Sequence, residues 1–140
     1  MQFQIITPEK VVASEEISQV SIPTTTGEIT ILPHHTPIIA VIQPGELRYT
    51  KNGEEFSLAI SGGFLEVREN GMVVILADTA EHAHEINLAR AEEARDKAAA
   101  LMRSERNTED VNYGALAAQV EKELARLRVG NKYRNLKNIK

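Results

Sequence analysis

The chain has 140 residues, of which 42% are hydrophobic and 26% are charged, and its formal net charge is −4. This composition is ordinary for a soluble domain with a real core. The absence of cysteine excludes disulfides and thiolate metal sites. No apolar run approaches the roughly 18 residues of a membrane span, and the N-terminus lacks the pattern of a signal peptide. We therefore expect one domain, or a small domain with an appendage.

Residues 1–85 read as short strands between turns. Asn52-Gly53 and Asn70-Gly71 are strong hairpin signals. All three Phe residues lie in this half, so we expect it to hold the core. Such closely spaced strands predict an antiparallel β-sandwich or flattened barrel. Alternating or continuous apolar residues mark the expected strands at 3–5, 11–12, 17–22 (with a bulge), 29–31, 38–42, 47–49, 56–60, 65–67 and 72–76.

A first helix is predicted over 88–106. This segment has no Gly or Pro and contains six Ala, the best helix former, whose small side chain also lets another helix approach closely. Asn87 precedes it and is suited to cap the free amides of its first turn.

A second helix is predicted over about 113–128, capped by Asp110 or Asn112 and ended by Gly130-Asn131. One apolar face is spaced at helical steps and consists of Leu116, Val120, Leu124 and Leu127.

Residues 86–140 are therefore predicted to form an antiparallel two-helix hairpin with a basic tail. Its apolar stripes are thin and rich in Ala, so the packing is expected to contribute only about a few kcal/mol, comparable to a conformational equilibrium. We interpret the hairpin as one that opens when a partner binds. A static hairpin docked on the barrel is the alternative.

Charge is unevenly distributed along the chain. Residues 122–140 contain seven basic residues and one acidic residue, whereas the remainder contains nine basic and nineteen acidic residues. A basic segment on an acidic body indicates a protein partner, with a solvated, frayed tail as the alternative. Nucleic acid is disfavoured, because Tyr133 is the only aromatic residue of the basic segment and the body repels phosphate.

No catalytic constellation is present in the sequence. The pattern G-x-x-x-x-G-K-S/T is missing, and Gly62-Gly63 precedes a strand, so we expect a close-packed turn there and not a phosphate-binding loop. His34-His35 and His82-x-His84 lack the arrangement of a metal site, and we predict no metal. A generic barrel-plus-hairpin adaptor and a small metal-dependent enzyme using these histidines are the alternatives.

Four segments resemble a known family in order and spacing. They are VSIPTTTGEITILPHHTPIIAVIQPGELR, AISGGFLEVRENGMVVILADTAE, INLARAEEARDKAAAL and LARLRV. Together they resemble the epsilon subunit of the bacterial F-type ATP synthase over nearly the whole chain. The combination of GE-x-x-ILP-x-H-x-P, SGGF-x-EV and ILAD-x-AE is specific, although each alone is weak.

The resemblance implies a non-catalytic rotor subunit that couples proton-driven rotation to ATP synthesis and needs no cofactor. It implies that the barrel packs on the gamma subunit and on the c-ring loops, and that an extended hairpin reaches the alpha and beta subunits and blocks ATP hydrolysis. It also implies a peripheral position on the cytoplasmic face of the bacterial cell membrane, reached only through the complex.

The resemblance also assigns individual residues. Glu28 and His35 correspond to the ring-facing contacts, and Arg126, Arg128 and Lys132 form the basic face expected to meet the acidic beta subunit. Some members bind a regulatory ATP through an Ile/Leu-Asp-x-x-Arg-Ala motif. Here the Asp is replaced by Asn, which keeps the helix cap but removes an acidic acceptor. The candidate nucleotide residues are Ile86, Asn87, Arg90, Ala91, Lys122 and Arg126.

Overall fold

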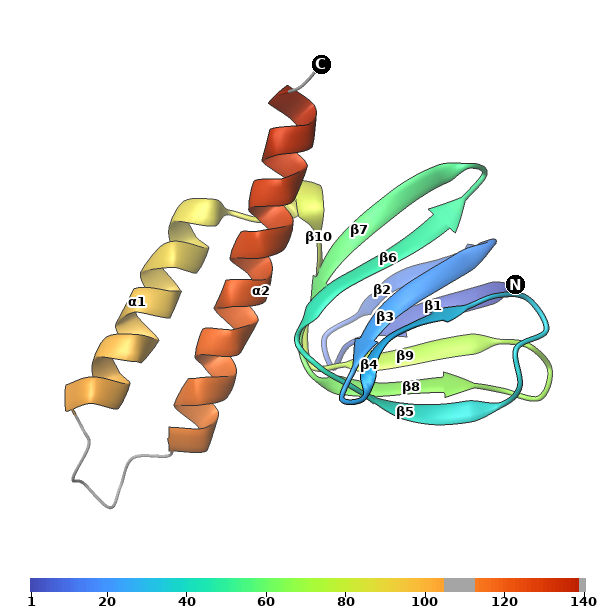
Figure 1. The fold of residues 1–140 in the computed structure, drawn as a ribbon, viewed down its shortest axis with the longest axis horizontal. Helices are drawn as coiled ribbons and strands as arrows, with labels where there is room; N and C mark the ends of the chain where they lie inside the picture. Colours follow the sequence, from blue (N-terminus) through green and yellow to red (C-terminus); the bar gives the residue numbers. More distant parts are fainter. Residues whose placement is uncertain (105–112, 139–140) are drawn as a thin grey trace.

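The computed structural model describes residues 1–104 and 113–138. Within them the chain forms ten strands, a short 3₁₀ helix and two α-helices (Figure 1). The strands are β1 Gln2–Ile6, β2 Val11–Glu16, β3 Gln19–Thr24, β4 Gly27–Ile31, β5 Ile38–Ile42, β6 Gly45–Lys51, β7 Glu54–Ile60, β8 Gly63–Val67, β9 Val73–Ala77 and β10 Ala80–His82. The helices are η1 Ala83–Glu85, α1 Leu88–Ser104 and α2 Tyr113–Asn138.

The strands form one sheet that folds over into two layers, as Figure 1 shows. Its order is β10-β7-β6-β3-β5-β8-β9-β1-β2, with β4 paired to β3 outside this path. Strand β3 joins the layers, because it pairs with β6 over Gln19–Ser21 and with β5 at Thr24. The predicted antiparallel sandwich or flattened barrel is confirmed, with one parallel pair between β1 and β9.

The core lies between the layers and is built from alternate residues of the strands. Phe3 and Tyr49 are buried, and their ring centroids lie 5.2 Å apart. Phe56 also stacks with Tyr49, with ring centroids 5.1 Å apart. Phe64 departs from the expected core, because it is 55% exposed on the outer face of β8.

Two predicted turns have the expected geometry. Asn52 and Gly53 both have positive φ, 52° and 78°, which is typical of the tight turn that joins β6 to β7. Gly63 has φ 156°, and a Cβ there would lie 2.0 Å from the Leu76 carbonyl oxygen. Only glycine lets the two strands approach this closely, so the predicted close-packed turn is confirmed.

The antiparallel hairpin is also confirmed, with α2 lying between α1 and the barrel (Figure 1). Asn87 caps α1 as predicted, because its Oδ1 accepts a hydrogen bond from the Arg90 amide at 3.0 Å. Helix α1 is described as far as Ser104, and the last two residues of the predicted helix lie outside the described residues. The predicted caps of the second helix, Asp110 and Asn112, lie outside the described residues.

The predicted stop at Gly130-Asn131 is wrong, because α2 continues to Asn138. A Cβ at Gly130 would lie 2.6 Å from Leu88 Cδ2 and 3.1 Å from Ile86 Cγ2. Gly130 therefore serves close packing against the start of the first helix, which offsets its low helix propensity of about 1 kcal/mol.

The hairpin packs through small side chains. Ala91 and Ala98 of α1 are buried, and so are Ala125 and Val129 of α2. The four apolar residues of the predicted face (Leu116, Val120, Leu124 and Leu127) are only half-buried. Neither described helix is long and apolar enough to cross a membrane.

Candidate functional site at the seam between α2 and the barrel

Arg126 is the central ion-pairing group of the seam. Its Nε donates to Glu81 Oε2 on β10 at 2.8 Å, and its Nη1 donates to Glu123 Oε2 one turn earlier on α2 at 2.7 Å. Glu123 is only 2% exposed. Burial opposes the charge of Arg126, but the bonds to both carboxylates outweigh it and raise the pKa of the guanidinium. Arg126 therefore stays charged and ties α2 to the barrel.

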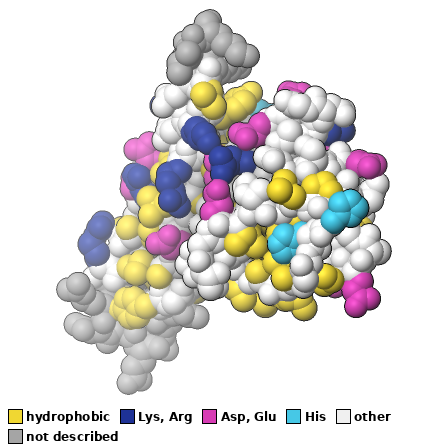
Figure 2. Space-filling model, turned by 45° about the vertical axis from the view of Figure 1, so that its right-hand side comes forward, with side chains coloured by type: hydrophobic (Ala, Val, Ile, Leu, Met, Phe, Trp, Pro, Cys, Tyr) yellow, Lys and Arg dark blue, Asp and Glu magenta, His cyan; other side chains and the backbone are white. Residues whose placement is uncertain are grey.

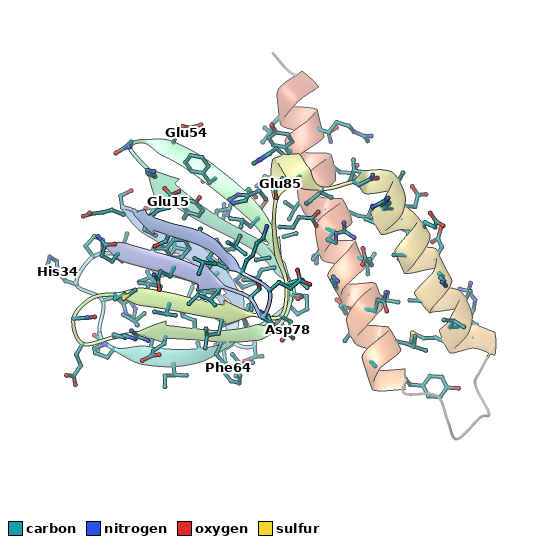
Figure 3. The ribbon with its side chains drawn as sticks, turned by 180° about the vertical axis from the view of Figure 1, so that it is seen from behind. Glu15, His34, Glu54, Phe64, Asp78 and Glu85 are labelled. Carbon is teal, nitrogen blue, oxygen red and sulfur yellow. The ribbon has the colours of Figure 1, made fainter. Side chains whose placement is uncertain are left out.

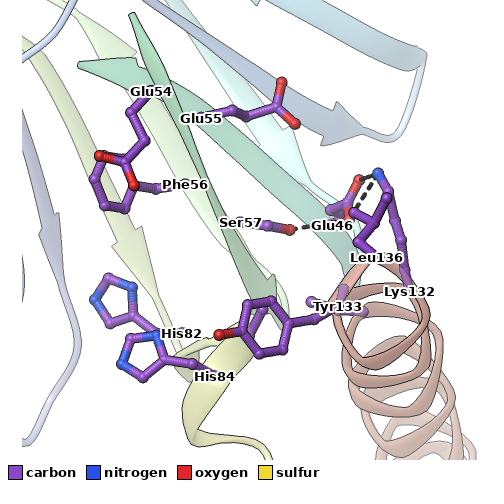
Figure 4. Close-up of a pocket in the computed structure, with 12 residues that line it drawn as sticks. Glu46, Glu54, Glu55, Phe56, Ser57, His82, His84, Lys132, Tyr133 and Leu136 are labelled. Atoms are coloured by element: carbon purple, nitrogen blue, oxygen red, sulfur yellow. Dashed lines mark hydrogen bonds and ion pairs between the residues drawn. The ribbon is translucent and has the colours of Figure 1, made fainter. Parts of the chain in front are cut away.

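A second ion pair ties the C-terminal third of α2 to β6. Lys132 Nζ donates to both oxygens of Glu46, at 2.9 and 3.2 Å (Figure 4). Ser57 on β7 donates to the same carboxylate at 2.9 Å. Between the two ion pairs, Val129 packs into a small apolar cluster with Ala59 and Ala83, with Ile86 beside it.

Arg128 differs from the other two residues of the predicted basic face. Its side chain is exposed, and it forms no ion pair with any residue in the described part of the chain. It borders a shallow groove of about 190 Å³ beside Glu46 and Lys132. Two of the three predicted cations, Arg126 and Lys132, are thus bound to barrel carboxylates, and Arg128 faces solvent.

A cleft of about 400 Å³ opens where the end of α2 meets the barrel (Figure 4). Phe56 lines it from β7 and Tyr133 from α2, while His82 and His84 stack at 5.5 Å on a third side. No three His, Asp or Glu side chains within 1–104 and 113–138 are grouped to hold a metal ion. The cleft is therefore a product of helix docking, because both the barrel and α2 contribute walls.

The candidate nucleotide residues are divided between two places. Lys122 and Arg126 line a second cleft, of about 380 Å³, together with the carboxylates Glu81 and Glu85. Arg90 on α1 and its cap Asn87 are exposed and do not line that cleft. Of the remaining two, Ala91 is buried and Ile86 packs beside the cluster of Ala59, Ala83 and Val129. Regulatory ATP binding stays a prediction.

The candidate ring-facing residues lie toward opposite ends of β4. Glu28 is at the start of the strand, where its carboxylate accepts a hydrogen bond from Arg48 at 2.7 Å. His35 lies in the loop after the strand, and its Nδ1 donates to the Thr36 carbonyl at 2.6 Å. Figure 3 places the neighbouring His34 at the end of the barrel away from the helices.

Sequence reasoning missed an apolar row on the outside of the barrel. The strand registers pair Val41 with Phe64, Phe64 with Leu76, Leu76 with Ile6, and Ile6 with Val11. These five residues, here called the apolar row, cross β5, β8, β9, β1 and β2, and all but the half-buried Ile6 are exposed. Figure 2 shows hydrophobic side chains gathered on the barrel surface and basic side chains over the helices.

The sequence did carry a signal for the apolar row. The runs 38–42 and 72–76 are apolar at consecutive positions, so both faces of each strand are apolar. One face fills the core, and on the other face Val41 and Leu76 are exposed. An exposed apolar stripe across five strands is typical of a protein interface.

Comparison with known proteins gives consistent matches. The family described as ATP synthase, Delta/Epsilon chain, beta-sandwich domain matches residues 1–83. The ATP synthase epsilon chain of Herpetosiphon aurantiacus is 50% identical over 131 residues, covering 91% of this chain and 96% of that protein. The epsilon chain of Chloroflexus aggregans is 44% identical over 130 residues, covering 92% and 91%.

Solved structures share the fold. A chain in the cryo-EM structure of the Euglena gracilis mitochondrial ATP synthase, described as OSCP/F1/c-ring, superposes with a TM-score of 0.74 at 24% identity. The match covers 88% of this chain and 76% of that one. At this identity the likeness supports the fold alone.

Proposed function

The chain belongs to the ATP synthase epsilon-chain family, whose members are non-catalytic subunits of the central stalk, and we propose that it couples proton-driven rotation to ATP synthesis and restrains ATP hydrolysis through α2. This assignment replaces the two alternatives of a generic adaptor and a metal-dependent enzyme. The proposal has two parts, a fixed contact made by the barrel and a releasable contact made by the hairpin.

The apolar row is the proposed contact with the gamma subunit. Its five side chains lie on the outer face of one layer, away from the seam that α2 covers. Burying such a row against a partner supplies the main free energy of a stable interface. The barrel can therefore stay attached to the stalk while the hairpin moves.

Phe64→Ser tests this contact. We expect about a tenfold or greater loss of affinity for purified gamma subunit, because a large exposed aromatic residue within such a row is a typical hot spot. Leu136→Ser on α2 makes a similar change at another exposed apolar side chain and should leave the affinity unaltered. Equal losses in the two variants would point to a different interface.

The releasable contact rests on one observation: Arg126 and Lys132, two of the three residues expected to hold the beta subunit, bind Glu81 and Glu46 of the barrel. An acidic surface on the hexamer would compete with those barrel carboxylates for the same cations. Docking of α2 and inhibition would then exclude each other, which is the behaviour required of a reversible brake.

The brake is tested in the assembled enzyme with Arg126, Arg128 and Lys132 all replaced by Ala. ATP hydrolysis should rise, because the released helix loses the charges that hold it in the hexamer. In the unmodified enzyme, added salt should weaken inhibition for the same reason. Unchanged hydrolysis in the triple variant would remove the basic face from the mechanism.

We assign the ring contact to the exposed side of β4, with Glu28 at its start and His35 beyond its end. Strand β4 pairs only with β3 among the described strands, so its other side is open to a partner. The subunit would thereby sit on the cytoplasmic face of the bacterial cell membrane, peripherally and through the ring.

A further inference from the structure

Four charged side chains alternate in sign from the β3–β4 turn to α2. Glu28 accepts from Arg48 Nη2 at 2.7 Å, Arg48 Nε lies 3.4 Å from Glu46 Oε1, and Glu46 accepts from Lys132 at 2.9 Å. We propose that this row of four charged side chains, here called the ionic chain, couples the start of β4 to the docking of α2. A cationic group that draws Glu28 away from Arg48 weakens the ion pair between Glu46 and Lys132. The coupling is a property of the isolated subunit and goes beyond the contacts proposed above.

The backbone fixes the middle of the ionic chain. Glu46 and Arg48 are two residues apart on β6, so their side chains project from the same face of the sheet. Arg48 pairs with Ser57 on β7 and with Ser21 on β3. Strands on both sides of β6 hold this pair in place. A change at either end of the ionic chain is therefore transmitted through side chains and not through a shift of the backbone.

Glu46 is the point of competition. Its carboxylate already receives Lys132 Nζ and Ser57 Oγ, while Arg48 Nε is buried and has no well-formed hydrogen bond. Arg48 Nε does not form a hydrogen bond to Glu46, because Glu28 accepts from Nη2 and draws the guanidinium toward itself.

Losing Glu28 as the partner of Arg48 can only weaken the docking of α2. Arg48 then turns to the other carboxylate within reach, Glu46, and satisfies its buried Nε there. Arg48 and Lys132 then share the single carboxylate of Glu46, and the two cations repel each other. Both effects weaken the Lys132–Glu46 pair and loosen the C-terminal third of α2.

The partner group that would act on Glu28 is a Lys or Arg side chain. The Glu28 side chain is 51% exposed, so such a group can reach the carboxylate without displacing the strand. A contact made at the turn would thus be transmitted to the helix on the other side of the seam.

The test uses the full isolated chain and measures amide hydrogen exchange over residues 129–136 of α2. Glu28→Gln removes the charge and keeps the shape of the side chain, and we expect exchange there to rise about two- to fivefold, the scale of a partly exposed ion pair. In a Lys132→Met background the same substitution should have no further effect. Glu66→Gln, which removes a carboxylate paired with Arg68 on the other layer, is the matched control.

Two results would overturn the coupling. One is unchanged exchange over 129–136 in Glu28→Gln. The other is the same rise with and without Lys132, or an equal rise at the β9 amides, because either would show general loosening of the barrel and not transmission through the ionic chain. Neither result depends on the enzyme's hydrolysis rate, so this test and the test of the brake can fail separately.

Discussion

Replacing Arg126 with Gln should release α2 from the barrel. The guanidinium bonds Glu81 at 2.8 Å and Glu123 at 2.7 Å, and without it two carboxylates face each other across the seam. Glu123 is 2% exposed and cannot turn to water while the helix stays docked.

The size of the effect follows from this burial. Removing one partner of a fully buried ion pair costs about 3–5 kcal/mol. Here the Arg126 side chain is 18% exposed and that of Glu81 is 29% exposed, so water screens part of the interaction. We therefore expect a loss of about 2 kcal/mol in docking, or roughly a thirtyfold shift of the equilibrium toward released helix.

The assay is hydrogen exchange of the α2 amides in the isolated chain, with Arg128→Gln as the matched control. Arg128 lies on the same helix, carries the same charge and forms no ion pair with another described residue, so its replacement should change docking by less than about twofold. Equal effects of the two variants would refute the reasoning, because net charge and not the specific pairing would then govern docking.

In the assembled enzyme the two variants should separate further. Arg128→Gln removes a cation that only the released helix uses, so hydrolysis should rise. Arg126→Gln both frees the helix and weakens its contact with the hexamer, so its effect on hydrolysis should be the smaller of the two.

Three other predictions follow from the packing, a buried phenol and the altered motif. Gly130→Ala places a methyl carbon 2.6 Å from a Leu88 methyl, so the packing of α2 on the start of α1 should weaken by about 1 kcal/mol in the exchange assay, since the gain in helix propensity is the same for the closed and the open hairpin; unchanged exchange would contradict it. Burial, and then the charge of Glu15, raise the pKa of Tyr49 above its ordinary 10.0, so neutral Tyr49 stabilises the fold fully below that pH and the stabilisation is lost as pH rises through the folded pKa. As pH rises from about 8 to about 11, the free energy of unfolding from denaturant titrations should fall less for Tyr49→Phe than for the unmodified chain. An equal fall in both would contradict this. Asn87→Asp should bind ATP more tightly than the unmodified chain in calorimetry, because it restores an acidic acceptor, and equal affinities would contradict that role.

Local patterns in the sequence predict most of the elements, but not the short β10 and η1. Alternating apolar residues gave the strands of the barrel, Asn52-Gly53 gave the β6–β7 turn, and the Asn87 cap marked the start of α1. The sequence wrongly predicts a helix end at Gly130, because a glycine after an amphipathic run is most often a helix stop. Only the position of Leu88 against it reveals that it serves close packing.

The site could be predicted only in part. The basic residues of α2 were evident, but their partners were not, because Glu81 lies 45 residues from Arg126 and Glu46 lies 86 residues from Lys132. Charge pairing across such separations depends on how the hairpin docks. The apolar row has the same origin, since its residues are brought together only by the registers of five strands.

The most direct test of the central claim is the distance between barrel and α2 in the assembled enzyme. The chain has no cysteine, so Glu54→Cys at the start of β7 and Arg134→Cys on α2 would carry spin labels at these two positions alone. Pulsed electron paramagnetic resonance should give one short distance between the two labels in the isolated chain. In the complex with hydrolysis inhibited it should give a second, longer distance. A distribution that stays short in the inhibited complex would show that α2 never leaves the barrel, and the brake would have to be sought elsewhere.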